Sequence, residues 1–194
     1  PRRSGGGHVM RNNTGINLFN AFRTRPNNIN QDSNIEIYEN RFFNIRDNDF
    51  EPEGWAWNIH YHHNWHYNVH KAYSIDDVRG GNIYIFGNTY TQGNDSYSRA
   101  EVSGIFKYKD GPLTYPCFAF NNSYYTEARV LKDGEATNHL LKHFNNAYYF
   151  FSGSQRFQVD AWQTGYEFDY DLINQEFPPI ITDNQQETNG LENT

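Results

Sequence analysis

Acidic residues crowd into the stretch "RDNDFEPEG", which places four carboxylates within seven residues: Asp47, Asp49, Glu51 and Glu53. Repulsion and poor strand propensity make such crowding costly, which favours a functional role over a solvated face balanced by Lys and Arg. A second acidic pair, Asp76 and Asp77, follows in "SIDDVRGG". If the two segments are neighbouring strands, their carboxylates lie about 5 to 7 Å apart. Either one pKa is then raised, which yields a general acid and base, or a cation such as Ca²⁺ lies between the carboxylates.

Histidines form a second group, because "HYHHNWHYNVH" contains five of them within eleven residues: His60, His62, His63, His66 and His70. His60 and His62 are two residues apart and would share one face of a strand, a spacing that can chelate a metal. The stretch has no Cys partner and no His-Glu-x-x-His pattern. Three interpretations therefore stay open: a metal site, an acid or base role for His60 or His70, and ring stacking or surface polarity.

The composition indicates one all-β domain. A chain of 194 residues suffices for a single domain with its own core. Aromatic residues make up 18% of it, which favours strands over helices. The net charge of -7 argues against nucleic acid and anionic membranes as partners, because both attract basic surfaces. The single Cys117 excludes an internal disulfide, and no apolar run is long enough to span a membrane.

A repeat positions these groups. Each unit is an apolar run that ends at a turn-like Asn: Asn13, Asn40, Asn64, Asn88, Asn122 and Asn146. Three of the gaps are 24 residues, and the other two are 27 and 34, as loop insertions would make them. The flanking positions align too, since the residues five before each Asn are His8, Ile35, Ile59, Ile83, Cys117 and Leu141.

Alternating apolar residues on both sides of each Asn predict a strand, a bend and a second strand. Units of this size predict a parallel solenoid, in which each coil buries its inward residues against the next. The Asn amides would stack as a ladder that donates to one coil and accepts from the other. The alternative is an antiparallel sandwich or barrel, whose strands recur roughly every 8 to 12 residues.

Aromatic columns flank the Asn ladder. We expect the residues three after each Asn to face the core, among them Phe43 and Tyr67. The neighbouring column should then face outwards, where its rings suit the apolar faces of pyranose sugars or are covered by another segment: Phe42, His66, Tyr90, Tyr124 and Tyr148.

The repeated phrase with its stacked Asn, as in "NIYIFGN", resembles the right-handed parallel β-helix (pectate-lyase-like) superfamily of polysaccharide lyases and glycoside hydrolases. The resemblance covers about residues 8–151 and implies a solenoid of about six coils. It also implies that a third strand follows each Asn and that its outer face forms a carbohydrate cleft. The third strands would be residues 47–54, 72–81 and 96–104.

The acidic residues fall on these third strands. If the coils are in strict register, the acidic side chains that stack are Glu53, Asp77 and Glu101. If Phe50 instead aligns with Ile75, Glu51 lies beside Asp76. Both alignments stay open. We predict a catalytic group, of which the first four members are also candidate Ca²⁺ ligands: Glu51, Glu53, Asp76, Asp77, Lys71 and Arg79. We predict substrate binding by a second group: His60, His62, His66, His70, Tyr90, Arg99 and Glu101.

These features predict coils over residues 1–151, capping strands over 152–170 and a polar tail or strap over 171–194. No segment caps the first coil, so we expect either further coils of a longer chain or another subunit at the coil ends. The function that follows is cleavage of a polysaccharide by a lyase or glycoside hydrolase, with no nucleic-acid partner and no membrane insertion. The alternative is a non-catalytic carbohydrate-binding or structural solenoid, like a tailspike segment or an extracellular assembly subunit. In either case we expect a secreted protein whose signal peptide lies outside this chain.

Overall fold

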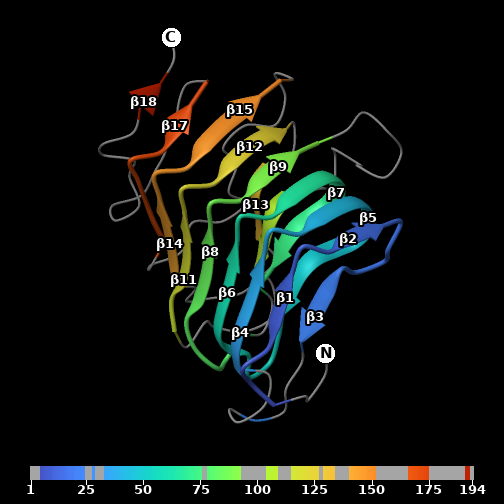
Figure 1. The fold of residues 1–194 in the computed structure, drawn as a ribbon. Helices are drawn as coiled ribbons and strands as arrows, with labels where there is room; N and C mark the ends of the chain where they lie inside the picture. The colour runs from blue at the N-terminus through green and yellow to red at the C-terminus, as the bar shows by residue number, and fades with distance from the viewer. Residues whose placement is uncertain are drawn as a thin grey trace.

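The computed structural model describes residues 5–24, 28, 33–75, 78–92, 104–108, 115–126, 129–133, 140–151, 166–174 and 191–192. These residues form a parallel β-solenoid of about five turns (Figure 1). The described part of the chain contains no helix that is long and apolar enough to cross a membrane. The strands are β1 (Val9–Arg11), β2 (Thr14–Ile16), β3 (Phe22–Thr24), β4 (Ser33–Tyr38), β5 (Arg41–Pro52), β6 (Trp57–His62), β7 (Trp65–Ser74), β8 (Ile83–Phe86), β9 (Thr89–Thr91), β10 (Gly104–Tyr108), β11 (Cys117–Phe120), β12 (Ser123–Thr126), β13 (Arg129–Asp133), β14 (Leu141–Phe144), β15 (Ala147–Phe150), β16 (Tyr166–Asp169), β17 (Leu172–Ile173) and β18 (Leu191–Glu192).

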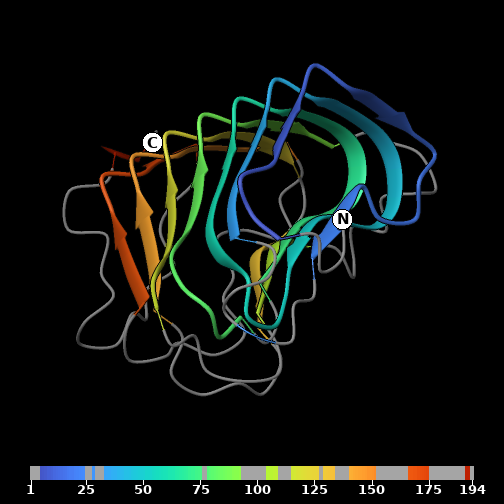
Figure 2. The ribbon, with the colours of Figure 1, turned by 60° about the horizontal axis from the view of Figure 1, so that its bottom comes forward.

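The strands make three faces around one packed interior, which we call the bore (Figure 2). Face A is a sheet of 7 strands in the order β1-β4-β6-β8-β11-β14-β16. The second sheet bends because β5 and β7 are long enough to belong to two faces. Face B consists of β2, the first halves of β5 and β7, and then β9, β12, β15, β17 and β18. Face C consists of β3, the second halves of β5 and β7, and then β10 and β13.

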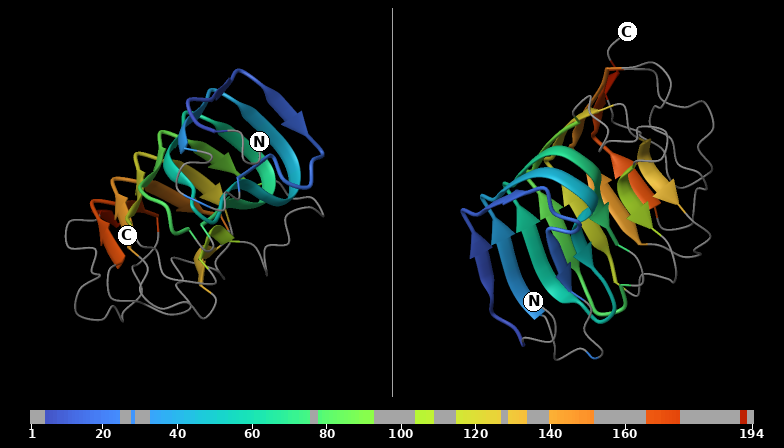
Figure 3. Two further views of the ribbon diagram at one scale, coloured as in Figure 1. Left: turned by 90° about the horizontal axis from the view of Figure 1, so that it is seen from below. Right: turned by 90° about the vertical axis from the view of Figure 1, so that its right-hand side faces the viewer.

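The predicted all-β solenoid is therefore confirmed, with a slightly different coil count. Strands on face C belong to five coils, through β3, β5, β7, β10 and β13, whereas six coils were predicted. Past residue 151, where the sequence indicated capping strands and a tail, β16 adds one strand to face A, and β17 and β18 add two strands to face B. β1 and β17 lie at opposite ends of the stack (Figure 3).

A ladder of buried Asn side chains forms the corner between faces A and B. Asn88, for example, donates from Nδ2 to the Tyr61 carbonyl and to Asn122 Oδ1, both at 3.0 Å. The residue before each ladder Asn adopts a left-handed conformation, with φ of 53° at His63 and 63° at Gly87. This sharp bend interrupts backbone pairing, and the stacked amides supply the missing hydrogen bonds. The predicted ladder is confirmed, and Asp171 adds a last rung by accepting from Asn146.

The prediction of which aromatic column faces outwards is wrong. The column two after each ladder Asn faces the bore and is at most 2% exposed: Phe42, His66, Tyr90, Tyr124 and Tyr148. The column three after it lies outside, where Tyr125 and Tyr149 are 45% and 52% exposed. The physical reason is that each ladder Asn itself points inwards, so the alternation of the following strand starts from a buried residue.

Candidate functional site

Two glutamates at the end of β5 form a compact cluster with an arginine from the first coil. Arg23 on β3 lies in register with Glu51. Its Nε lies 3.1 Å from Glu51 Oε2, and its Nη2 lies 2.9 Å from Glu53 Oε2. Asn20 donates to Glu51 Oε2 at 2.6 Å, and Asn48 donates to Glu51 Oε1 at 3.3 Å. Both oxygens of Glu51 therefore accept from neighbouring donors.

Burial changes the acidity of this cluster. The side chains of Glu51 and Glu53 are only 5% and 10% exposed. The pKa of Glu51 is raised to about 7, first by burial and then by the charge of Glu53 and a hydrogen bond with it, against the opposing charge of Arg23. A carboxyl that is half protonated near neutral pH beside a second carboxylate has the charge state of a general acid.

A bulge in β5 decides the alignment of the acidic segments. The pairing of β5 with β7 shifts between Ile45 and Asn48, because one extra residue is accommodated there. Phe50 consequently pairs with Tyr73, so the predicted match of Phe50 to Ile75 is wrong. The 24-residue register returns only at the bridge between Gly54 and Val78.

The two glutamates do not fit a Ca²⁺ site as arranged. Ca²⁺ needs several free oxygen ligands, whereas Glu51 accepts hydrogen bonds from Asn20 and Asn48 and forms an ion pair with Arg23. The guanidinium group already supplies the positive charge that the crowded carboxylates need. No group of three or more His, Cys, Asp or Glu side chains within the described residues could hold a metal ion. The other two predicted ligands, Asp76 and Asp77, lie outside the described residues, as do Arg99 and Glu101.

The cation beside the carboxylates is not one that the sequence analysis selected. Lys71 lies in β7, in register with Asn48 and Gly104, and Arg79 is exposed, with its backbone donating to the Gly54 carbonyl at 2.7 Å. Arg23 was missed because residues 1–31 contain no acidic residue that would draw attention to it. Aligning Phe22 with Phe50 would have placed Arg23 opposite Glu51.

The histidines separate into an outer and an inner group. On face A, Glu36 lies between His60 and His62, at 2.9 Å from His60 Nδ1 and 3.1 Å from His62 Nε2. The ring of His62 stacks between Tyr38 and Phe86, with centroid distances of 5.0 and 4.6 Å. This arrangement matches the interpretation of the cluster as stacking and surface polarity. His70 lies half-buried on β7.

His66 and Tyr90 face the bore. His66 is fully buried and its Nδ1 is hydrogen-bonded to the equally buried Asp49. Burial raises the pKa of Asp49, and the adjacent His66 opposes that rise. Solvent does not reach either side chain, so a substrate-binding role for His66 is not supported. The Tyr90 hydroxyl donates to the Val69 carbonyl at 2.8 Å.

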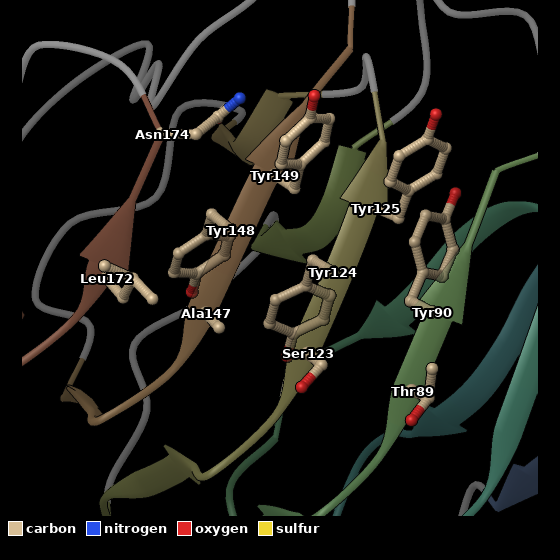
Figure 4. Close-up of a pocket in the computed structure, with 10 residues that line it drawn as sticks. All are labelled: Thr89, Tyr90, Ser123, Tyr124, Tyr125, Ala147, Tyr148, Tyr149, Leu172 and Asn174. Atoms are coloured by element: carbon tan, nitrogen blue, oxygen red, sulfur yellow. The ribbon is translucent and has the colours of Figure 1, made fainter. Parts of the chain in front are cut away.

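The outer surface of face B holds a groove of about 580 Å³ (Figure 4). Its lining comes from β9, β12, β15 and β17 and the residues after β17: Thr89, Tyr90, Ser123, Tyr124, Tyr125, Ala147, Tyr148, Tyr149, Leu172 and Asn174. Two rows of side chains cross the strands, with Tyr125, Tyr149 and Asn174 in one row and Thr89, Ser123, Ala147 and Leu172 in the other. Tyr90, Tyr124 and Tyr148 lie between the rows, and because their side chains face the bore, their backbone forms the floor of the groove.

Exposed rings dominate one side of the groove. Tyr125 and Tyr149 stack with their centroids 5.3 Å apart and their planes 10° apart. Tyr125 also stacks with Phe151 at 4.8 Å. Interlocked rings lose little side-chain entropy when a ligand binds, so they form a firm apolar platform.

The solenoid agrees with the parallel β-helix architecture that the sequence resembles. Comparison of the chain with known proteins finds no matching family model, no matching curated protein and no matching solved structure. Membership of the pectate-lyase-like superfamily therefore stays a prediction.

Proposed function

We propose that this chain is a carbohydrate-binding solenoid that holds a polysaccharide in the groove on face B. The observation that carries this proposal is the row of exposed, stacked tyrosines beside a row of small and hydroxyl side chains. Aromatic rings pack against the apolar faces of sugars, and hydroxyl groups satisfy the sugar hydroxyls around them. A polysaccharide ligand also supports a secreted or extracellular location.

Affinity gel electrophoresis against a panel of neutral and acidic polysaccharides tests the proposal. Retardation by at least one polysaccharide is expected, and Tyr149→Ala should abolish most of it, since Tyr149 is the most exposed ring in the groove. Tyr115→Ala is the matched control, because Tyr115 is 49% exposed but does not line the groove. Unretarded migration with every polysaccharide, or equal loss of binding in the two variants, would refute the proposal.

A second candidate function is cleavage of a polysaccharide by the Glu51 and Glu53 pair. The raised pKa of Glu51 favours it, since a retaining or inverting glycosidase needs one protonated and one ionised carboxyl group. The donors that saturate both oxygens of Glu51 weigh against it, because the carboxyl would have to leave Asn20 and Arg23 to reach a substrate. We therefore propose carbohydrate binding as the first candidate function and polysaccharide cleavage as the second.

Release of reducing ends, together with absorbance of unsaturated products, distinguishes the two candidates. Reducing ends that appear without absorbance, persist in EDTA and disappear in Glu51→Gln would establish a metal-independent hydrolase. Absorbance of unsaturated products that EDTA abolishes would instead indicate a metal-assisted lyase. Complete inactivity toward a polysaccharide that the protein binds would leave binding as the function.

A further inference from the structure

The groove on face B is linear and follows the stacking direction of the coils. Each row takes one residue from each successive coil, since Thr89 lies in register with Ser123, Ser123 with Ala147, and Ala147 with Leu172. Neighbouring strands are about 4.8 Å apart, so equivalent groups repeat at that interval along the groove. A repeating row suits a polymer that runs across the strands better than it suits one compact small molecule.

None of the described residues that line the groove carries a formal charge. None of the ten lining residues is an Asp, Glu, Lys, Arg or His. The chain as a whole carries a net charge of -7. A polyanion such as a polyuronate would find no cation among these ten residues, although carboxylate recognition in proteins relies on Arg or Lys. The negative net charge of the protein would also repel it.

The polar groups that remain are hydroxyls. The side-chain hydroxyls of Thr89, Ser123, Tyr125 and Tyr149 form no hydrogen bond with other described residues. Asn174 is different, because its Oδ1 accepts from the Phe150 amide at 2.8 Å and its Nδ2 donates to the Phe150 carbonyl at 3.1 Å. Asn174 therefore holds the end of its row in place, and the free hydroxyls can both donate to and accept from a ligand.

From these three observations we infer that the groove binds a neutral, linear polysaccharide whose chain runs along the solenoid axis across β9, β12, β15 and β17. This inference rests on the proposed function and narrows its ligand. It argues against the acidic polysaccharides that Lys71 and Arg79 were expected to recognise, since neither of these two residues lines the groove.

Isothermal titration calorimetry with the full chain tests the inference. The probes are soluble neutral polysaccharides (xylan, mannan and a mixed-linkage glucan), acidic ones (polygalacturonate and alginate) and the monosaccharides of the neutral polymers. We expect at least one neutral polymer to bind, and its monosaccharide to bind at least tenfold more weakly. Tyr149→Ala should weaken binding of the polymer by about tenfold, which corresponds to about 1.4 kcal/mol, whereas Tyr115→Ala should not.

The dependence of affinity on salt concentration provides a second test of the inference. The affinity for the neutral polymer should change by less than about twofold between low and high NaCl, because no ion pair is screened. Binding of the acidic polymers alone, with an affinity that falls as salt rises, would overturn the inference while leaving the proposed carbohydrate-binding function intact. Binding of none of the probes would overturn both. Undiminished binding of a neutral polymer by Tyr149→Ala would move the site away from the groove and overturn the inference as well.

Discussion

At the residue scale, buried titratable groups are held in the charge state that costs least. Arg23 lies against Glu51 and Glu53, and the high pKa of Glu51 allows that carboxyl to carry a proton near neutral pH. In the bore, burial lowers the pKa of His143 to about 3, so its ring is neutral between Phe106 and Phe168. Protonation of these two groups should therefore affect stability in opposite directions.

Glu51→Gln should flatten the pH dependence of stability. The folded state raises the pKa of Glu51 from 4.5 to about 7, so it holds the proton more tightly than the unfolded chain does. The contribution of Glu51 to the free energy of unfolding consequently falls as pH rises from about 4.5 to about 7, and it is constant at higher pH. The total fall is up to about 3 kcal/mol, at about 1.4 kcal/mol for each unit of pKa difference. Urea unfolding at pH 5 and pH 8 should show a smaller difference for Glu51→Gln than for the wild type. Ser123→Ala is the control that keeps the wild-type difference, and equal differences in all three proteins would contradict the assigned pKa.

His143→Phe should protect the protein against acid. Because the folded state lowers the pKa of His143 from 6.5 to about 3, the unfolded chain takes up the proton first as pH falls below about 6.5, and stability is lost. Phe fits between the same rings but cannot be protonated. At pH 4 the variant should gain about 3 kcal/mol over the wild type relative to their difference at pH 7. Thermal unfolding at the two pH values measures this, and parallel loss of stability in the two proteins would show that His143 is not the group responsible.

At the element scale, the Asn ladder joins faces A and B at a bend where backbone pairing stops. Asn121 and Asn122 show the two roles of Asn in this bend. Asn121 is exposed and adopts φ of 56°, and its neighbour Asn122 is buried. Asn122 Nδ2 donates to the Ile85 carbonyl and to Asn146 Oδ1, at 3.1 and 3.0 Å. Asn122 Oδ1 accepts from the Asn88 amide and side chain, both at 3.0 Å.

Asn122→Ala should destabilise the protein by at least about 3 kcal/mol, because it leaves several buried donors and acceptors without partners. Asn121→Gly, one residue away, should cost less than about 1 kcal/mol, since glycine adopts the left-handed conformation without strain. Chemical denaturation of the two variants provides the comparison. Similar losses in both would mean that the bend, rather than the buried ladder, provides the stability.

At the scale of the whole molecule, the described strands of each coil pair only with strands of the neighbouring coils. β8 pairs with β6 on one side and β11 on the other, whereas β1 pairs only with β4 among the described strands. Apolar side chains of the first coil are also exposed, with Val9 at 59% and Phe19 at 63%. Stability in such a stack is the sum of coil and interface contributions, so the first coil should be the weaker part.

Native-state hydrogen exchange should therefore be uneven along the axis. We expect the amides of β8 and β11 to exchange most slowly and those of β1 and β2 at least about tenfold faster, which corresponds to about 1.4 kcal/mol of local opening free energy. Residue-resolved exchange by NMR provides the measurement. Equal protection of β1 and β8 would contradict a weak first coil and would indicate that another chain covers it in solution.

Much of the fold was predictable because the sequence repeats at a regular interval. The columns around Asn40, Asn64 and Asn88 recur at one interval, and only a stacked solenoid brings such columns into register. The candidate sites were less predictable. The acidic residues were identified, but their partner Arg23 lies 28 positions before Glu51, an offset that the repeat of 24 does not reveal.

The solenoid and its Asn ladder follow from the amino-acid sequence, because hydrogen bonding at each corner requires the same residue type at the same interval. The folded structure was needed to show which aromatic column fills the bore, which cation neutralises Glu51 and Glu53, and where a groove opens. These outcomes depend on the left-handed residue at each bend and on the bulge in β5. One residue's backbone conformation can turn a whole strand over, and spacing along the chain carries no information about that choice.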